Sequence, residues 1–256
     1  MGKIIAVANQ KGGVGKTTTS INLSASLAAT KRRILLIDID PQGNATMGSG
    51  VNKNELKHSL NELLTGKQPF EKVCVSTNAG YDLLPSNSDL IVAEVKLFQL
   101  NDRETRLYNL LKPVAPKYDF ILIDCPPSLN VLTLNSLVAA DSLLIPMQCE
   151  YYALEGLSGL INTMEQIRDN LNSRLEVEGI LRTMYDGRNR LSVEVSDQLL
   201  NHFGEKVYRT VIPRNVRLAE APSYGMPAIH YDKRSHGAVA YLALAGEVLR
   251  RQKQSS

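Results

Sequence analysis

A glycine-rich turn close to the start of this 256-residue chain limits its possible folds more than any other part of the sequence. An apolar run at residues 4–8 predicts a buried β-strand, and a helical pattern begins at about residue 17. Between them, three glycines stand within residues 12–15. Such a turn leaves room for backbone N–H groups to converge on an anion, and the following helix adds its positive N-terminal dipole. The turn is therefore expected to bind phosphate.

The side chains of this turn predict which phosphate compound it binds. Lys16 is expected to reach the β- and γ-phosphates of a nucleotide, and the Thr17 hydroxyl to ligate Mg²⁺. The common phosphate-loop pattern has a glycine where this chain has Gln10, and a second lysine, Lys11, stands just after it. Since two cations exceed what one triphosphate needs from its own subunit, we expect Lys11 to point outward, toward a second nucleotide. The expected ATP-binding residues of the turn are Lys11, Gly12, Gly13, Val14, Gly15, Lys16, Thr17 and Thr18.

Short apolar, β-branched runs alternate with longer amphipathic stretches along the whole chain. Strands are predicted at residues 4–8, 34–39, 81–84, 120–123, 142–146 and 177–183. Helices are predicted at about residues 17–29, 54–64, 87–98, 103–113, 130–139, 154–170, 192–203 and 236–251. Alternation of helices with continuously apolar strands is typical of a parallel sheet covered on both faces. The predicted fold is one α/β domain over residues 1–256, a doubly wound, mostly parallel sheet that binds ligands beyond the carboxyl ends of its strands.

Composition excludes several classes of protein. Hydrophobic residues make up 43% of the chain and charged residues 21%, which is ordinary for a globular protein. No apolar stretch approaches the roughly 20 residues of a spanning helix, and Asn9 ends the first apolar run too early for a signal peptide. Three scattered cysteines, Cys74, Cys125 and Cys149, form no paired framework and predict buried thiols in a reducing compartment. A membrane span and a disulfide scaffold are thus not expected, and the cytoplasm is the expected location.

The net charge of +3 hides an uneven distribution. Residues 1–181 carry 17 basic and 19 acidic side chains, whereas residues 182–256 carry 12 basic and 7 acidic ones. A basic C-terminal third on a slightly acidic body is typical of a protein that binds a polyanion. A solvated surface equally explains the excess of basic side chains. Charge alone therefore leaves both interpretations open.

Two aspartates stand at predicted strand ends, where a bound nucleotide would lie. Phosphoryl transfer requires charge neutralisation and a positioned water. Asp124 follows a continuous apolar run, as a Walker B carboxylate does, and is expected to hold Mg²⁺ directly or through water. Asp40 ends the second predicted strand, and Pro41 then opens a loop. An aspartate at a strand end also commonly caps the next turn, so a structural role stays open for both.

Five stretches of the sequence share their pattern with one known family. They are residues 11–18 (Lys-Gly-Gly-Val-Gly-Lys-Thr-Thr), 38–46, 123–128, 183–186 and 211–223, and they span nearly the whole chain. The chain thereby resembles the deviant Walker ATPases, and within them the ParA/Soj chromosome-partition proteins. The resemblance implies a P-loop ATPase fold and an ATP-sandwich homodimer in which Lys11 contacts phosphates bound by the partner subunit. It also implies that Asp40 positions the attacking water. Asp38 is expected to support the metal site without contacting the metal directly. The expected catalytic residues are Lys11, Lys16 and Asp40, and the expected metal ligands are Thr17, Asp124 and Asp40.

The same resemblance assigns recognition of the base to the segment Pro213-Arg214-Asn215. Pro213 is expected to lie against the adenine ring, and Asn215 to reach the ring edge. The segment follows a strand-like pattern at residues 206–212 and precedes a short predicted helix. Because Pro-x-Asn is also common in plain turns, a simple turn is the alternative.

Related partition ATPases bind DNA without sequence preference through basic side chains of the dimer. Phosphate contacts of that kind weaken with salt and are independent of sequence. Aromatic residues make up only 5% of the chain and tryptophan is absent, so duplex DNA is a better expectation than single strands stacked on aromatic rings. Among the candidate contacts we favour Arg188 and Arg217. The full candidate set is Arg188, Arg190, Arg214, Arg217, Lys233 and Arg234.

The function that the resemblance implies is that of a DNA-partition ATPase with weak basal turnover. ATP closes the dimer, the dimer binds the nucleoid, and a ParB-like partner stimulates hydrolysis and release. The first strand begins by Lys3, which leaves no room before it for the helix-turn-helix domain of some plasmid partition ATPases. We therefore expect DNA binding to be independent of sequence.

The main alternative is a membrane-associated regulator of division-site placement, similar to MinD, which would end in a basic amphipathic helix. The last predicted helix here has an apolar stripe at core-facing spacing, and residues 250–256 offer no apolar face, so no stable membrane anchor is expected. The stripe consists of Val239, Leu242, Ala245, Val248 and Leu249. Two further alternatives lack support: an iron protein of the nitrogenase type needs two suitably placed cysteines, and a small-molecule ATP-dependent enzyme needs a substrate pocket.

Overall fold

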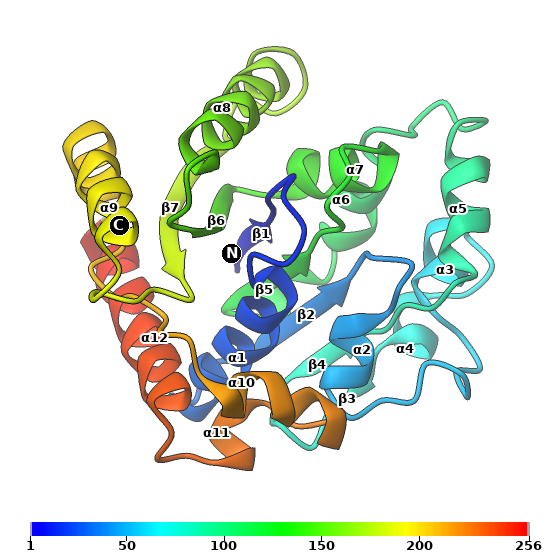
Figure 1. Ribbon diagram of the computed structural model, residues 1–256. Coiled ribbons are helices and arrows are strands. Elements are labelled where there is room, and N and C mark those ends of the chain that lie inside the picture. Colours follow the sequence, from blue (N-terminus) through cyan, green and yellow to red (C-terminus); the bar gives the residue numbers. More distant parts are fainter. Residues whose placement is uncertain (1, 255–256) are drawn as a thin grey trace.

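A seven-stranded β-sheet forms the centre of the computed structural model, which describes residues 2–254 (Figure 1). The strand order is β3-β4-β2-β5-β1-β6-β7, and only the pairing of β3 with β4 is antiparallel. The strands are β1 (Lys3–Val7), β2 (Ile34–Asp38), β3 (Val75–Ser76), β4 (Asp82–Leu84), β5 (Phe120–Asp124), β6 (Ser142–Gln148) and β7 (Glu176–Thr183). The predicted mostly parallel sheet is confirmed.

The predicted strands all occur, because their apolar runs are long enough to be buried on both faces. In the central strands β2 and β5 every residue is buried. The short edge strand β3 was not predicted, since two residues are too few to show a period. It pairs antiparallel with β4 and ends the sheet on that side.

Helices cover both faces of the sheet (Figure 1). One hydrophobic core joins one face to residues of α3 and α5–α8, and a second core joins the other face to α1, α11 and α12. The helices are α1 (Lys16–Ala29), α2 (Asn44–Gly48), α3 (Leu60–Leu64), α4 (Phe70–Val73), α5 (Leu90–Leu97), α6 (Arg106–Leu111), α7 (Val131–Ala139), α8 (Ala153–Asn170), α9 (Arg190–Phe203), α10 (Val216–Glu220), α11 (Ala228–Tyr231) and α12 (His236–Gln254). The doubly wound architecture is therefore confirmed.

The helix predicted at residues 54–64 is much shorter in the structure. Only Leu60–Leu64 is helical, and residues 54–59 are turns and bends. A capping box sets this start: Asn61 N donates to Ser59 Oγ, and Ser59 N donates to Glu62 Oε2 at 2.8 Å. The serine thus satisfies the first turn of the helix and prevents its extension toward the N-terminus.

The buried face of α12 differs from the predicted stripe. Val239 is 52% exposed and Leu242 36% exposed, so the prediction was wrong for both. Ala245 and Val248 of the predicted stripe are buried, and the full set of buried residues is Gly237, Ala238, Tyr241, Leu244, Ala245, Glu247 and Val248. The helix presents this face because it packs along α1, where the Tyr241 hydroxyl lies 3.0 Å from Thr19 Oγ1. Within residues 2–254, no helix is both long and apolar enough to cross a bilayer.

The strand-like pattern at residues 206–212 does not form a strand. The segment contacts β7 at separate points: an isolated bridge joins Ile180 and Val207, and the backbone N–H groups of Tyr208 and Ile212 donate to β7 carbonyl groups, each at 2.9 Å. Between these points side chains satisfy the backbone: Glu247 accepts the N–H groups of Arg209 and Thr210, each at 2.9 Å, and the Arg182 guanidinium donates to Tyr208 O at 2.9 Å. The backbone is thus held beside β7 without forming a continuous strand.

Candidate nucleotide-binding site

Three neighbouring strands bring the predicted site residues to one edge of the sheet. In the parallel register, Asp124 at the end of β5 stands opposite Val7 of β1 on one side and Asp38 of β2 on the other. The glycine-rich loop leaves β1 at this same edge. The two aspartates and the loop, far apart in sequence, therefore meet at the carboxyl ends of the strands, where doubly wound sheets bind ligands.

The loop conformation depends on its glycines. Gly13 has φ +73° and Gly15 has φ +87°, in the left-handed region that side chains disfavour. Gly15 is the N-cap of α1, so the backbone N–H groups of the first helical turn face the loop. Thr183, at the end of β7, donates its hydroxyl to Val14 O at 2.7 Å and anchors the loop to the sheet. The backbone is thus shaped to receive an anion.

Lys16 lies at the base of the loop and is only 7% exposed. Its Nζ donates to Lys11 O at 3.0 Å, which folds the ammonium group under the loop. Burial lowers the pKa of Lys16, and the nearby carboxyl group of Asp124 partly offsets this effect. The lysine therefore places a buried cationic group within the phosphate loop.

The carboxylate of Asp124 is held by two hydroxyl groups of α1. Thr17 Oγ1 donates to Asp124 Oδ2 and Ser20 Oγ donates to Asp124 Oδ1, both at 2.8 Å. Burial raises the pKa of Asp124, and the neighbouring Asp38 raises it further. Hydroxyl and carboxylate oxygens are ligands that Mg²⁺ prefers, and Mg²⁺ commonly takes one or two protein oxygens together with phosphates and waters. The donor set of Thr17 and Asp124 fits that use.

Within residues 2–254 there is no group of three or more His, Cys, Asp or Glu side chains arranged to hold a metal. Asp38 is fully buried and turned toward another partner, since its Oδ2 accepts both the backbone N–H and the hydroxyl of Thr46 at 2.7 Å. Burial raises the pKa of Asp38, and these hydrogen bonds counteract the effect. Asp38 thus supports the loop after β2 from behind Asp124.

Asp40 lies at the mouth of the site. Its Oδ1 accepts the Gln42 N–H at 2.9 Å, and its backbone oxygen accepts the Ser86 hydroxyl at 2.8 Å. The residue is half-buried and lines the same cleft as Lys16 and Thr17. Its carboxylate can therefore face a water beside a bound phosphate while the backbone of the loop stays fixed.

Lys11 lies on the outside of the loop. Its side chain is 47% exposed, and its Nζ forms an ion pair with Glu150, just beyond β6. The ammonium groups of the two lysines thus have different partners, because that of Lys16 donates to the loop backbone. The sequence offered no signal for the role of Glu150 in holding Lys11.

A cleft of about 800 Å³ connects the phosphate loop with the segment at residues 212–215. Pro213, Arg214 and Asn215 line it together with Asp40 and Lys16. Asn215 Oδ1 is buried and has no hydrogen-bond partner. A buried acceptor of this kind is costly unless it is satisfied. It is suited to an amino group of a ligand in the cleft.

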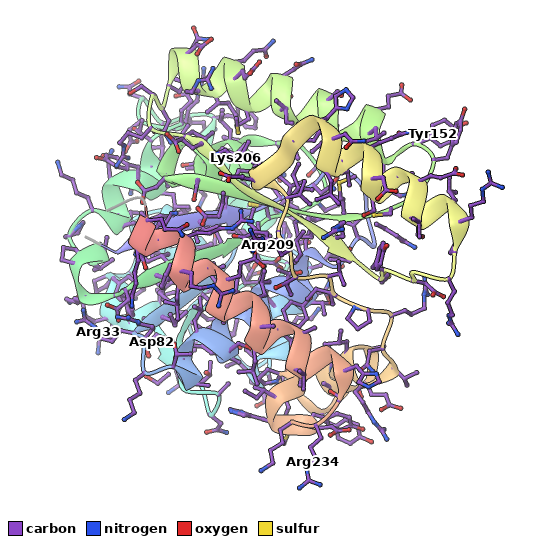
Figure 2. The ribbon with its side chains drawn as sticks, turned by 90° about the vertical axis from the view of Figure 1, so that its left-hand side faces the viewer. Arg33, Asp82, Tyr152, Lys206, Arg209 and Arg234 are labelled. Carbon is purple, nitrogen blue, oxygen red and sulfur yellow. The ribbon has the colours of Figure 1, made fainter. Side chains whose placement is uncertain are left out.

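The six candidate DNA contacts have different surroundings. Three are paired with carboxylates of the same chain: Arg188 with Asp186, Arg190 with Glu194, and Arg217 with both Glu220 and Asp232. Arg214 lines the cleft. Lys233 and Arg234 lie in the turn before α12, and Arg234 points away from the body of the molecule (Figure 2).

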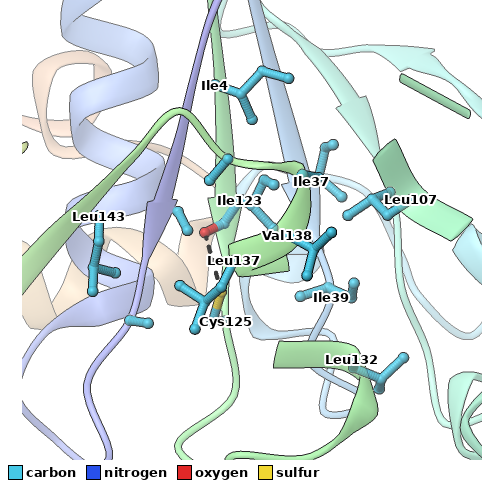
Figure 3. Packing of buried hydrophobic residues seen from close by; sticks show 14 of the residues in the cluster. Ile4, Ile37, Ile39, Leu107, Ile123, Cys125, Leu132, Leu137, Val138 and Leu143 are labelled. Carbon is cyan, nitrogen blue, oxygen red and sulfur yellow. Dashed lines mark hydrogen bonds between the residues drawn. The ribbon is translucent and has the colours of Figure 1, made fainter. Parts of the chain in front are cut away.

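Cys125, directly after Asp124, is a packing residue. It is 1% exposed, and its Sγ lies 3.7 Å from Ile123 O among the aliphatic side chains of the core (Figure 3). Burial raises the pKa of its thiol to about 12. The residue therefore contributes apolar volume behind the site, as its isolation in the sequence indicates.

A parallel doubly wound sheet with a glycine-rich loop after its first strand defines a P-loop NTPase fold. A family model described as an AAA domain matches residues 2–177. The sporulation initiation inhibitor protein Soj of Bacillus subtilis is 52% identical over 97% of this chain and 98% of its own length. The chain belongs to the family of the ParA and Soj chromosome-partitioning ATPases.

Solved structures share the fold over the whole chain. Cobyrinic acid a,c-diamide synthase from Mycobacterium smegmatis, solved with bound ADP and magnesium, has a TM-score of 0.88 at 37% identity, covering 100% of this chain and 97% of its own. The cell division ATPase MinD from Pyrococcus furiosus has a TM-score of 0.81 at 26% identity, covering 98% and 99%.

Proposed function

We propose that this protein is a DNA-partition ATPase that binds ATP and Mg²⁺ in the cleft between its phosphate loop and residues 212–215. The observation that carries the proposal is that one continuous cleft is lined both by buried Lys16 and by Asn215, whose Oδ1 has no hydrogen-bond partner. A nucleotide has charged phosphates at one end and an exocyclic amino group on adenine at the other. Its two ends therefore match the two ends of the cleft.

The residues at the phosphate end have separate tasks in this proposal. Lys16 and the backbone of the loop bind the β- and γ-phosphates, and Thr17 and Asp124 hold Mg²⁺. Bound Mg²⁺ neutralises charge on the phosphates during transfer. Asp40 orients the attacking water, since its carboxylate lines the cleft while Ser86 fixes its backbone.

At the base end, Pro213 packs against adenine and Asn215 accepts a hydrogen bond from its amino group. This segment has a rigid support, because Glu247 and Arg182 hold the preceding backbone. The distance between base and phosphate sites is thereby set by the fold, which favours one nucleotide orientation.

The active form in this proposal is a homodimer. The exposed Lys11 leaves Glu150 and binds phosphates held by the partner subunit, so each ATP lies between two copies. An exposed ion pair of this kind contributes little stability, roughly 0–1 kcal/mol, so it can be exchanged readily. Phosphate then takes the place of the carboxylate as the anionic partner of Lys11.

The dimer binds duplex DNA through its basic C-terminal third and is nucleoid-associated. Pairing two copies doubles the basic surface, which strengthens binding through avidity. Hydrolysis, slow alone and stimulated by a ParB-like partner, separates the copies and releases the DNA. We propose that residues 1–256 act as one ATPase unit in this cycle.

Sedimentation with either duplex DNA or liposomes, each with ATP or ADP, tests this function. We expect the protein to pellet with DNA in ATP and to stay in the supernatant in ADP. Lys16→Ala, which removes the buried cation of the loop, is the control and should not pellet. Pelleting with liposomes alone would favour a MinD-like function instead. Binding to neither, with ATP turnover requiring a small-molecule co-substrate, would favour a biosynthetic enzyme.

A further inference from the structure

The loop between β7 and α9, residues 184–189, lines the nucleotide cleft near its start and carries Arg188, a candidate DNA contact, near its end. Met184 lines the cleft and has φ +49°, an unusual backbone conformation for a residue other than glycine. Tyr185 N donates to Ile212 O at 3.0 Å, and Tyr185 forms an isolated bridge with Pro213. The loop is therefore attached to the segment proposed to contact adenine.

Asp186 stands next in this loop and holds the guanidinium of Arg188. Arg188 Nε donates to Asp186 Oδ1 and Nη2 donates to Asp186 Oδ2, both at 3.0 Å. The backbone N–H of Arg188 also donates to Oδ1 at 3.0 Å. The arginine is 91% exposed, so this carboxylate orients a side chain that otherwise extends into solvent.

The carboxylate of Asp186 is ionised throughout the physiological range. Hydrogen bonds from Arg188 lower the pKa of Asp186 to about 2, and the charge of Arg214 contributes. Asp186 is thus a fixed negative charge close to two of the candidate DNA contacts, one in this loop and one in the cleft segment.

We propose that Asp186 is a positioning residue that holds Arg188 in a two-bond ion pair and thereby limits the affinity of the ATP-bound protein for duplex DNA. This inference rests on the proposed DNA-binding function. The guanidinium of Arg188 donates to Asp186 with N–H groups that could otherwise donate to a DNA phosphate. A phosphate must displace this carboxylate or bind beside its negative charge, and either reduces affinity.

Arg190 and Arg217 are also paired: Arg190 with Glu194 of its own helix, and Arg217 with Glu220 of its own helix and with Asp232 after α11. Asp186 differs because it lies in a loop whose Tyr185 is hydrogen-bonded to Ile212 and bridged to Pro213 of the nucleotide cleft. The restraint on Arg188 therefore lies in a loop that is attached to the proposed nucleotide site.

The test is a titration of ATP-bound protein with duplex DNA at several salt concentrations. Asp186→Asn keeps the size of the side chain and an acceptor for the Arg188 N–H, but removes the charge. We expect it to bind DNA about three- to tenfold more tightly, with a steeper salt dependence as Arg188 becomes free for phosphate. Asp186→Glu, which keeps the charge, should bind as the unaltered protein does.

Two controls separate this role from a general effect of charge. Asp197→Asn removes one negative charge from the exposed side of α9 and should change affinity much less. In an Arg188→Ala background, Asp186→Asn should change affinity by less than about twofold, because its partner is gone. An equal gain with Asp197→Asn, or an undiminished gain without Arg188, would overturn the inference.

The remaining outcomes distinguish the two proposals. If the unaltered protein binds DNA in ATP and Asp186→Asn binds identically, the role of Asp186 is wrong while the DNA-partition function stands. If neither protein binds DNA although both bind ATP, the proposed function and this inference are both overturned.

Discussion

Thr17 and Asp124 are 107 residues apart in sequence, yet the Thr17 hydroxyl donates to Asp124 Oδ2 at 2.8 Å. Ser20 holds the other oxygen of the same carboxylate at 2.8 Å. The first turns of α1 therefore orient the acid at the end of β5 toward the phosphate loop. This arrangement places hydroxyl and carboxylate oxygens side by side, as a magnesium site requires.

Replacing Lys16 by alanine is expected to weaken ATP binding by about tenfold to a hundredfold, because hydrogen bonds to charged groups contribute about 1.5–3 kcal/mol. Titration with a fluorescent ATP analogue measures the change. Lys11→Ala is the matched control, and its monomer should retain ATP binding, since the Lys11 side chain is exposed and paired with Glu150. If Lys16→Ala bound ATP with unchanged affinity, the proposed role of Lys16 in phosphate binding would be wrong.

Replacing Asp40 by alanine is expected to leave ATP binding nearly intact and to stop turnover. The change removes one hydrogen bond, to Gln42 N, which costs roughly 0.5–1.5 kcal/mol of stability, while the Ser86 contact to the backbone persists. Phosphate release and DNA pelleting should be measured together. We expect the DNA-bound form to accumulate in ATP, and turnover at the normal rate would contradict the role of Asp40.

Gly12→Val tests the dimer. A Cβ built on Gly12 meets nothing within 4 Å, so the monomer should fold and bind ATP normally. The added side chain would instead crowd a partner subunit near Lys11, so we expect the variant not to dimerise in ATP. Analytical ultracentrifugation measures this loss. Gly13→Val is the contrasting variant, because φ +73° strains any side chain there and should weaken ATP binding itself. Undisturbed Gly12→Val dimers would count against the sandwich arrangement.

Glu247→Gln is expected to reduce the free energy of unfolding by about 1–3 kcal/mol, because the buried carboxylate accepts the backbone N–H groups of Arg209 and Thr210. Chemical denaturation at neutral pH measures this loss. ATP binding should also weaken, since the segment that Glu247 holds leads to Pro213. Unchanged stability would show that Glu247 does not hold this segment.

The loss of stability in Glu247→Gln should depend on pH. Burial by itself would raise the pKa of Glu247, but hydrogen bonds from Thr210 and Arg209 lower it below its ordinary value of 4.5. The ionised carboxylate thus stabilises the fold above about pH 4.5, and this contribution is lost as the pH falls through the lower pKa of the folded state. The difference in stability between Glu247→Gln and the unaltered protein should therefore shrink in acid.

Local signals predicted the strands well and the partners of side chains poorly. The apolar run that ends at Asp124 was long enough to define β5, and the glycines before Lys16 marked the loop. The strand-like pattern at residues 206–212 was misleading, because apolar alternation does not reveal that Glu247, a distant acid, accepts the backbone N–H groups of Arg209 and Thr210. The exposed positions Val239 and Leu242 were misplaced for a similar reason, since α1 decides which face of α12 is buried.

Local patterns in the sequence were enough to predict the parallel α/β fold, the phosphate loop and the aspartates at the strand ends. These depend on hydrophobic period and on backbone freedom at glycine, which are properties of short segments. Only the fold brings Asn215 to the same cleft as the phosphate loop, Glu150 to Lys11, and the loop that carries Asp186 and Arg188 to residues 212–213 beside that cleft. Hydrogen bonds and ion pairs of this kind depend on distance in space, which the order of residues along the chain does not specify.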